Sequence, residues 1–129
     1  MLNVLVFEEE PALRNTLSAF LRDDACRVVA PANFSEAANA VMQENFDIIL
    51  CGHRVGETDA LSFFHIIQDR QKTAVKVLMT EHPTRATQDE IRWAGIDYVI
   101  HMSAVFKCME TLKFSLVTAS HVRRTEAAH

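Results

Sequence analysis

Three consecutive carboxylates follow the first apolar segment of the chain. Residues 2–7 (LNVLVF) are apolar and lead directly into the glutamates Glu8–Glu10. In parallel α/β sheets ligands bind at the carboxyl ends of strands, where such carboxylates could hold a divalent cation. A second apolar segment, 46–51, also ends at a loop, but the next residue is Gly52. An acidic cluster that faces a residue without a side chain indicates a site whose original chemistry has been removed.

Composition and charge exclude several classes of protein. The 129 residues, 49% hydrophobic and 23% charged, predict one globular domain that buries about two thirds of its unfolded surface. The net charge of −4 and the scattered basic residues indicate no nucleic-acid partner. Three cysteines without metal-type spacing are typical of a reducing compartment. No apolar run is long enough for a membrane span and no signal peptide is recognisable, so we expect a cytoplasmic protein.

Strand-like and helix-like segments alternate along the chain. Apolar runs predict strands over 2–7, 27–30, 46–51, 75–80 and 96–100. Helices are predicted to start at Pro11, near Asn33 or Ser35, and after a loop over 52–58. The last two helices are predicted over 84–94, ended by Gly95, and over 105–122.

Five βα units with short connections predict a parallel sheet with helices on both faces. At this size we expect a flavodoxin-like (βα)5 three-layer sandwich, with strand order 2-1-3-4-5 and a functional crevice between the first and third strands. Glu8, Glu9 and Gly52 border that crevice. Residues 1–122 form the predicted domain, and residues 123–129 are expected to be a frayed C-terminal tail.

The same segments resemble the receiver domain of bacterial response regulators, the phospho-acceptor module of two-component signalling, with a chemotaxis-regulator-like layout. The resemblance covers almost the whole chain. Five motifs carry it in matching order: 4–14 (VLVFEEEPALR), 46–51 (FDIILC), 55–60 (VGETDA), 78–81 (LMTE) and 94–102 (AGIDYVIHM). It implies an acidic pair that holds Mg²⁺, an acceptor aspartate, a switch threonine and aromatic residue, and a lysine that neutralises the phosphoryl group.

The chemistry that the resemblance implies is incomplete in this chain. Thr80 and Tyr98 match the switch residues, but the acceptor position is Gly52 and the lysine position is His101. A receiver forms an acyl phosphate on a carboxylate, which glycine lacks. Imidazole is shorter than lysine and only partly charged at neutral pH. We therefore predict a degenerate phosphorylation pocket made of Glu8, Glu9, Gly52, Thr80 and His101.

The acidic pair leaves two interpretations open. Glu8 and Glu9 retain a weak Mg²⁺ site, or their carboxylates are satisfied by amides at a helix start, by water or by a nearby cation. No other cofactor is predicted. Arg54 either enters the space left by Gly52 and pairs with Glu9, or lies on the surface. His53 and His101 are metal ligands beside these acids, or plain hydrogen-bonding residues.

Two further groups of residues also have two interpretations each. Asp59 is either a relocated phospho-acceptor or the N-cap of the following helix, and the second is favoured because Asp59 lies beyond the strand end. Trp93 and Tyr98 are either binding anchors on the face formed by the fourth helix, fifth strand and fifth helix, or partly buried aromatic residues.

The sequence thus predicts a pseudo-receiver that is not an enzyme and acts by contact with a protein partner, a histidine kinase or another signalling protein, with a homodimer possible. No output domain follows in this chain, so we expect a stand-alone regulator or an excised receiver. One alternative is a phosphorylatable receiver with a non-standard acceptor. Another is a small flavodoxin-like enzyme, which would need a Gly-rich phosphate loop where Glu8–Glu10 stand.

Overall fold

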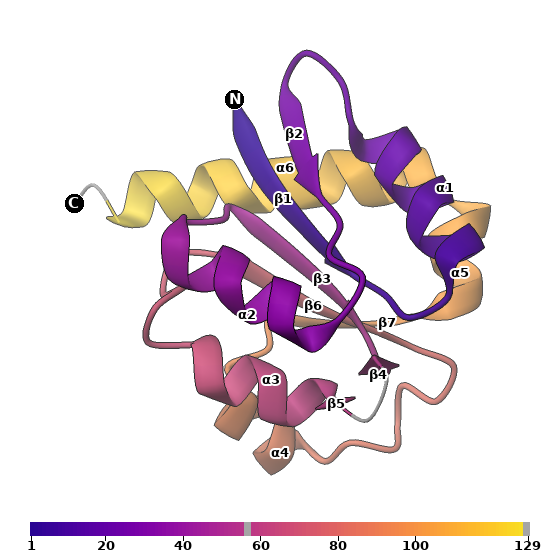
Figure 1. Cartoon of the computed structure of the whole chain (residues 1–129), viewed down its shortest axis with the longest axis vertical. Helices are drawn as coiled ribbons and strands as arrows, with labels where there is room; N and C mark the ends of the chain where they lie inside the picture. Colours follow the sequence, from indigo (N-terminus) through magenta and orange to yellow (C-terminus); the bar gives the residue numbers. More distant parts are fainter. Residues whose placement is uncertain (56–57, 128–129) are drawn as a thin grey trace.

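Five parallel strands form the central sheet of the protein (Figure 1). The structure is a computed structural model that describes residues 1–55 and 58–127, without the side chains of residues 54, 55 and 58. The strands of the sheet are β1 (Leu2–Phe7), β2 (Cys26–Val29), β3 (Ile48–Gly52), β6 (Val75–Thr80) and β7 (Tyr98–His101). Their order, β2-β1-β3-β6-β7, confirms the predicted order 2-1-3-4-5 and the flavodoxin-like fold.

A short antiparallel hairpin follows β3, where the sequence predicted only a loop over 52–58. It consists of β4 (Arg54–Val55) and β5 (Thr58–Asp59), with Arg54 opposite Asp59. The backbone N–H of Ala60 donates to the carbonyl oxygen of His53 at 3.1 Å, which continues the pairing. Such two-residue strands carry no alternating apolar pattern, so sequence periodicity does not reveal them.

Six helices complete the described part of the chain. They are α1 (Pro11–Leu21), α2 (Phe34–Gln43), α3 (Ala60–Ile67), α4 (Gln88–Ala94), α5 (Met102–Lys107) and α6 (Met109–Ala127). Asn33, one of the two predicted capping residues, caps α2, and Gly95 ends α4 with a φ of 72°, as predicted. Among the described residues, no helix has both the length and the apolar composition needed to cross a membrane.

Two helix boundaries differ from the prediction for local reasons. The fourth helix begins at Gln88 instead of residue 84, because Thr87 and Glu90 form a capping box that fixes its first turn. The predicted helix over 105–122 is two helices, since the backbone at Cys108 leaves the helical region with φ −135° and ψ 44°.

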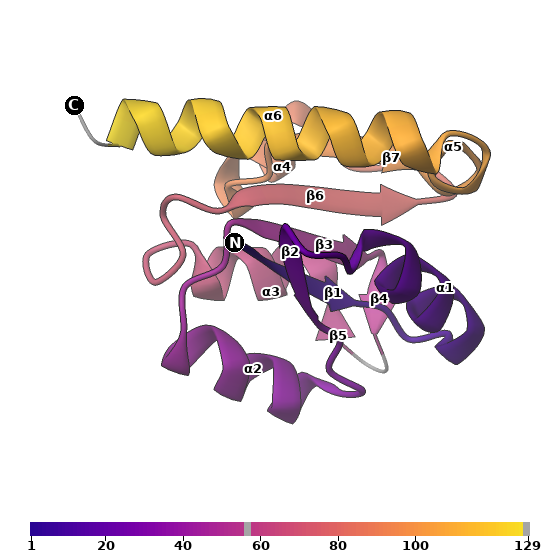
Figure 2. The same cartoon turned by 90° about the horizontal axis from the view of Figure 1, so that it is seen from above.

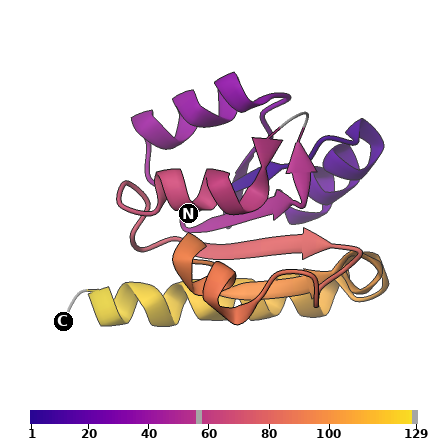
Figure 3. The same cartoon turned by 90° about the horizontal axis from the view of Figure 1, so that it is seen from below.

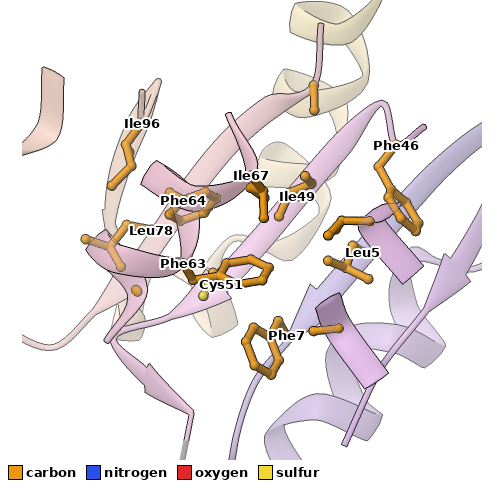
Figure 4. Packing of buried hydrophobic residues seen from close by; sticks show 14 of the residues in the cluster. Leu5, Phe7, Phe46, Ile49, Cys51, Phe63, Phe64, Ile67, Leu78 and Ile96 are labelled. Carbon is orange, nitrogen blue, oxygen red and sulfur yellow. The ribbon is translucent and has the colours of Figure 1, made fainter. Parts of the chain in front are cut away.

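Each face of the sheet is covered by its own set of helices, which gives three layers (Figure 2). Buried side chains from α2, α3 and α4 pack on one face, and side chains from α1, α5 and α6 pack on the other. Figure 4 shows the first cluster, in which Phe7, Cys51 and Leu78 from neighbouring strands meet Phe63 and Phe64 of α3. All five residues of β3 are buried, as its continuous apolar sequence predicts for a central strand.

The predicted frayed tail over 123–129 is wrong for residues 123–127, which continue α6 along the sheet (Figure 3). Residues 128–129 lie outside the described part. The Arg124 guanidinium donates to Asp47 Oδ1 at 2.8 Å, and the Arg123 guanidinium donates to Asp97 Oδ1 at 2.8 Å. These carboxylates directly precede apolar strand segments, so the two arginines fasten the last turns of the helix to the amino edge of the sheet.

The ion pair of Arg124 is expected to contribute measurably to stability. Asp47 is largely buried (14% exposed) and also accepts the backbone N–H of Asn3 at 2.7 Å, whereas Arg124 is 47% exposed. Because solvent screens the exposed partner, we expect Arg124→Gln to lower the free energy of unfolding by about 1 kcal/mol in urea denaturation. The matched control is Arg92→Gln, which removes a pair that is exposed on both sides and should change nothing. Equal effects of the two variants would contradict the fastening role.

Candidate functional site at the carboxyl edge of the sheet

A cavity of about 730 Å³ opens at the carboxyl edge of the sheet. Its described lining comes from the end of β6, from the segments that follow β1, β3 and β6, and from α1 and α5. The lining residues are Glu8, Glu9, Glu10, Ala12, Leu13, Thr16, His53, Met79, Thr80, Glu81, His82, Met102 and Phe106. The crevice between the first and third strands, where the sequence predicted the site, belongs to this edge.

The three consecutive glutamates have three different environments. Glu10 is the N-cap of α1, since its carboxylate accepts the backbone N–H groups of Ala12 at 3.2 Å and Leu13 at 2.8 Å. Glu9 is exposed. Glu8 is buried, with 6% of its surface exposed. For Glu8, the predicted satisfaction by amides at a helix start therefore holds only in part, and it is Glu10 whose carboxylate accepts two amides of the first turn of α1.

Glu8 is an incompletely satisfied buried carboxyl group. Its Oε1 accepts the backbone N–H of Glu10 at 3.3 Å, while its Oε2 has no hydrogen-bond partner among the described residues. The nearby Arg14 guanidinium donates to the backbone carbonyl of Glu8 at 3.1 Å. Burial raises the pKa of the Glu8 carboxyl above its ordinary value, the charges of Glu9 and Glu10 add to the rise, and backbone N–H groups oppose it.

Gly52 is buried at the end of β3 because Glu8 occupies the space beside it. A Cβ atom added to Gly52 would stand 3.1 Å from the carboxyl carbon of Glu8 and would overlap its Oε2. Any side chain at position 52 therefore requires the Glu8 carboxyl group to move. The resemblance assigns position 52 to the acceptor aspartate, so the Glu8 carboxyl group stands where that side chain would begin.

Thr80 and His101 lie at the ends of adjacent strands and face one another in the register of β6 and β7. Thr80 is buried, lines the cavity and accepts the backbone N–H of His82 at 3.0 Å. The ring of His101 instead caps α5, since its Nδ1 accepts the backbone N–H of Ser103 at 3.1 Å. Glu8, Glu9, Gly52 and Thr80 thus lie together at the carboxyl edge. The side chain of His101 instead caps the start of α5.

The loop after β3 holds the other predicted site residues. His53 lines the cavity. Asp59 is the N-cap of α3 and accepts the backbone N–H of Leu61 at 3.3 Å, which confirms that interpretation. The backbone of Arg54 lies in β4, but its side chain is outside the described part, so its predicted entry into the space beside Gly52 stays a prediction.

Trp93 and Tyr98 lie away from the cavity, on α4 and β7. They are 51% and 49% exposed, so both are half-buried surface aromatics. The Trp93 ring stacks on the ring of His65 of α3, with 3.8 Å between centroids and 9° between planes. Gln68 completes this contact by donating to the Trp93 carbonyl oxygen at 3.0 Å.

The described residues do not fit a Mg²⁺ ion. No group of three or more His, Cys, Asp or Glu side chains within residues 1–55 and 58–127 is arranged to hold a metal ion. Mg²⁺ needs several oxygen ligands in near-octahedral geometry, and one carboxylate oxygen of Glu8 is turned toward Gly52. We therefore assign no step at this site to a metal ion.

Comparison with known proteins identifies the family. A family model described as the response regulator receiver domain matches residues 4–108. The chain belongs to this family. The transcriptional regulatory protein ZraR from Klebsiella oxytoca is 27% identical over 126 residues, which cover 97% of this chain and 28% of ZraR. ZraR from Salmonella typhimurium is also 27% identical, over 98% of this chain and 28% of its own length. The chain spans little more than a quarter of the length of these relatives.

Solved structures support the same receiver fold. A response regulator from Burkholderia pseudomallei, solved with a phosphorylated aspartic acid, a calcium ion and citrate, has a TM-score of 0.72 and 23% identity. That match covers 99% of this receiver chain and 74% of the other chain. A receiver domain protein from Clostridium thermocellum has a TM-score of 0.82 and 11% identity, over 97% and 98% of the two chains. At these identities the likeness shows the fold alone.

Sequence reasoning missed the roles of Glu10 and of the apolar wall of the receiver's cavity. Proline is frequent at the first helical position, so Pro11 places Glu10 at the N-cap, and the role of Glu10 could have been found from this. The contributions of Met79, Met102 and Phe106 to the cavity depend on the packing of α5 against the sheet. No local sequence signal indicates them.

The burial of Glu8 makes stability depend on pH. Because its folded-state pKa lies above the ordinary value of 4.5, the folded protein binds more protons than the unfolded chain between the two values. The free energy of unfolding therefore falls as pH rises through that window. Glu8→Gln removes this contribution. The measurement is the free energy of unfolding of wild type and of Glu8→Gln, from urea denaturation at several pH values. We expect the difference, wild type minus Glu8→Gln, to fall as pH rises above 4.5 and then to level off.

The control variant is Glu9→Gln, which removes the exposed neighbouring carboxylate and reports the effect of local charge without burial. A difference between wild type and Glu8→Gln that is the same at every pH would contradict the raised pKa of Glu8.

Proposed function

We propose that this receiver signals through contact with a protein partner and does not accept phosphate on an aspartate. The observation that carries the proposal is the pairing of Gly52 with Glu8: position 52 has no side chain, and the Glu8 carboxyl group fills the space a side chain would need. The proposal includes no enzymatic activity of its own. It also includes no tightly held Mg²⁺ ion.

Phosphoryl transfer to a receiver needs an ionised carboxylate with open access to the donor. Glu8 is buried, so a phosphodonor has little access to its carboxyl group. The negative charges of Glu9 and Glu81 at the cavity would repel an anionic phosphodonor. These features argue against Glu8 itself as a non-standard acceptor.

Other nucleophiles near the end of β3 are also poorly suited to the reaction. The thiol of Cys51 is buried, and burial raises its pKa, so it stays in the weakly nucleophilic protonated form. The carboxylate of Asp59 is engaged at the start of α3. A small flavodoxin-like enzyme is disfavoured as well, since carboxylates rather than a Gly-rich loop follow β1.

The face formed by α4, β7 and α6 is our candidate surface for the partner, a histidine kinase, another signalling protein or a second copy of the chain. Trp93 and Tyr98 lie on this face and are half exposed. Large aromatic side chains of this kind are frequent anchors of protein interfaces. β7 is also the last strand of the described sheet, so one of its edges carries no neighbouring strand.

The proposal is tested by incubation with acetyl phosphate and Mg²⁺ followed by intact-mass measurement. We expect no change in mass, because no suitable carboxylate can attack the donor. A stoichiometric adduct that hydroxylamine removes would contradict the proposal. If that adduct disappeared in Glu8→Gln, Glu8 would be the acceptor, and if it disappeared in Asp59→Asn, Asp59 would be.

Restoring an aspartate at position 52 should not restore efficient phosphorylation. In Gly52→Asp the new side chain displaces the Glu8 carboxyl group and adds a third negative charge beside Glu8 and Glu9. We expect the free energy of unfolding at neutral pH to fall by about 1–3 kcal/mol, and Mg²⁺ to recover part of the loss by binding the folded state. The double variant with His101→Lys should be more stable and take up phosphate faster, although the new lysine gives up the cap of α5.

The control for this experiment is Gly52→Asn, which has the size of aspartate without its charge. A loss of stability in Gly52→Asn equal to that in Gly52→Asp would mean that steric displacement of Glu8 alone is responsible. If Gly52→Asp took up phosphate as readily as the double variant, position 101 would not be the deficient lysine position.

A further inference from the structure

A lysine is buried in the central sheet, near its amino edge. Lys76 is the second residue of β6, a strand that pairs with β3 on one side and with β7 on the other. Only 4% of its surface is exposed. Lysine is rarely buried to this extent unless its ammonium group is paired, and an apolar residue would fit a buried strand at less cost. An amine at this position therefore indicates a role for its nitrogen.

The Nζ atom of Lys76 has one weak hydrogen bond among the described residues, to the carbonyl oxygen of Ala74 at 3.4 Å. The Arg123 guanidinium donates to the same oxygen at 3.1 Å. The carboxylate of Asp97 is occupied by Arg123 and by the backbone N–H of Lys76. No ion pair in the described part of the chain includes the Lys76 amine. A positive charge on Lys76 would thus lie near that of Arg123 without a carboxylate of its own.

These surroundings favour the neutral amine. Burial lowers the pKa of the Lys76 amine below its ordinary value, the charge of Asp97 opposes this change, and the charge of Arg123 adds to it. A neutral amine has a free electron pair and can act as a nucleophile, whereas an ammonium group cannot. Lys76 is therefore chemically distinct from an ordinary surface lysine.

Lys76 also lines a cavity of about 430 Å³. The other described lining residues are Gln68, Asp69, Lys72, Gly95, Asp97 and Arg123. Because the Lys76 amine shares the Ala74 oxygen with the guanidinium of a lining residue, its nitrogen lies close to this wall of the cavity. The amine is thus shielded from bulk water and still near a space that a small molecule can enter.

The charges at the cavity distinguish between the electrophiles that react with an amine. An aldehyde gives an imine, which becomes cationic on protonation, whereas carbon dioxide gives an anionic carbamate. The Arg123 guanidinium makes three of these hydrogen bonds and has five N–H groups, so donors remain for an anion. Lys72 is exposed and forms no ion pair within the described part, so its ammonium group can also donate.

Two carboxylates line the same cavity and oppose an anion there. Asp97 is paired with Arg123 at 2.8 Å, which neutralises its charge. Asp69 is exposed, so water screens its charge. The cationic donors therefore favour the anionic product over a cationic one.

We propose that Lys76 is a site of reversible modification by carbon dioxide, which its neutral amine converts to a carbamate. The nitrogen forms a bond to the carbon of CO₂, the electron pair of one C=O bond moves to oxygen, and the nitrogen releases one proton to water. No further reactant is needed. The carbamate is stabilised by Arg123 and Lys72. This site is at the opposite edge of the sheet from Gly52, so it does not depend on how the receiver treats phosphate.

The test traps carbamates on the full chain in buffer that contains isotope-labelled bicarbonate and CO₂. Triethyloxonium ion converts a carbamate to a stable ethyl carbamate, which peptide mass spectrometry locates. At about pH 8 exposed lysine side chains are largely protonated. We therefore expect the labelled adduct at Lys76 and little at Lys107 or Lys113. The α-amino group of Met1 is the internal positive control, because α-amino groups of peptides are partly unprotonated at this pH.

Lys72→Met should lower the yield of adduct at Lys76 about threefold, as the loss of one exposed charge contact implies. The matched control is Lys107→Met, which removes an exposed lysine away from the cavity and changes the net charge equally. It should leave the yield at Lys76 unchanged. The proposal would be overturned by labelling of Met1 without labelling of Lys76, by equal labelling of Lys76 and Lys107, or by equal effects of the two variants.

Discussion

The Glu8 carboxyl group occupies the space that a side chain at position 52 would need. The properties of the carboxyl edge of the sheet depend on this contact between Glu8 and Gly52. Glu8 can be buried at the end of β1 only because position 52 on β3 leaves room for it. Burial raises the pKa of the Glu8 carboxyl group and leaves its Oε2 without a hydrogen bond among the described residues. Burying an unpaired polar atom costs free energy, which the packing around Glu8 has to offset. The sequence shows only that the acceptor aspartate is replaced by Gly52, whereas the structure shows that the Glu8 side chain also occupies the space beside it.

The carboxylates at the two edges of the sheet have different partners. At the amino edge, Asp47 and Asp97 are neutralised by arginines from the last turns of α6, so charge there contributes to holding the fold together. At the carboxyl edge, the described lining offers the glutamates helix amides and backbone N–H groups but no arginine or lysine. Within the part of the chain that the structure describes, the ion pairs thus lie away from the edge where receivers perform their chemistry.

The architecture could be predicted from the sequence because it is encoded in local patterns. Continuous apolar runs marked the buried strands, and Asn33 and Gly95 marked helix ends. The details that differed depend on contacts between distant segments: the extension of α6 rests on Arg123 and Arg124 meeting carboxylates across the sheet. The placement of Glu8 could not be predicted either, since adjacent glutamates look alike in sequence and differ only in the space that packing leaves for each.

The stacked rings of Trp93 and His65 give the protein a built-in optical reporter. Trp93 is the only tryptophan in the chain, and its contact with His65 joins α4 to α3. Indole emission is sensitive to a ring that lies 3.8 Å away in a parallel plane, so a displacement of α4 relative to α3 changes the fluorescence without any attached dye. Movement of this surface can therefore be followed in the unmodified protein, in real time and at low concentration.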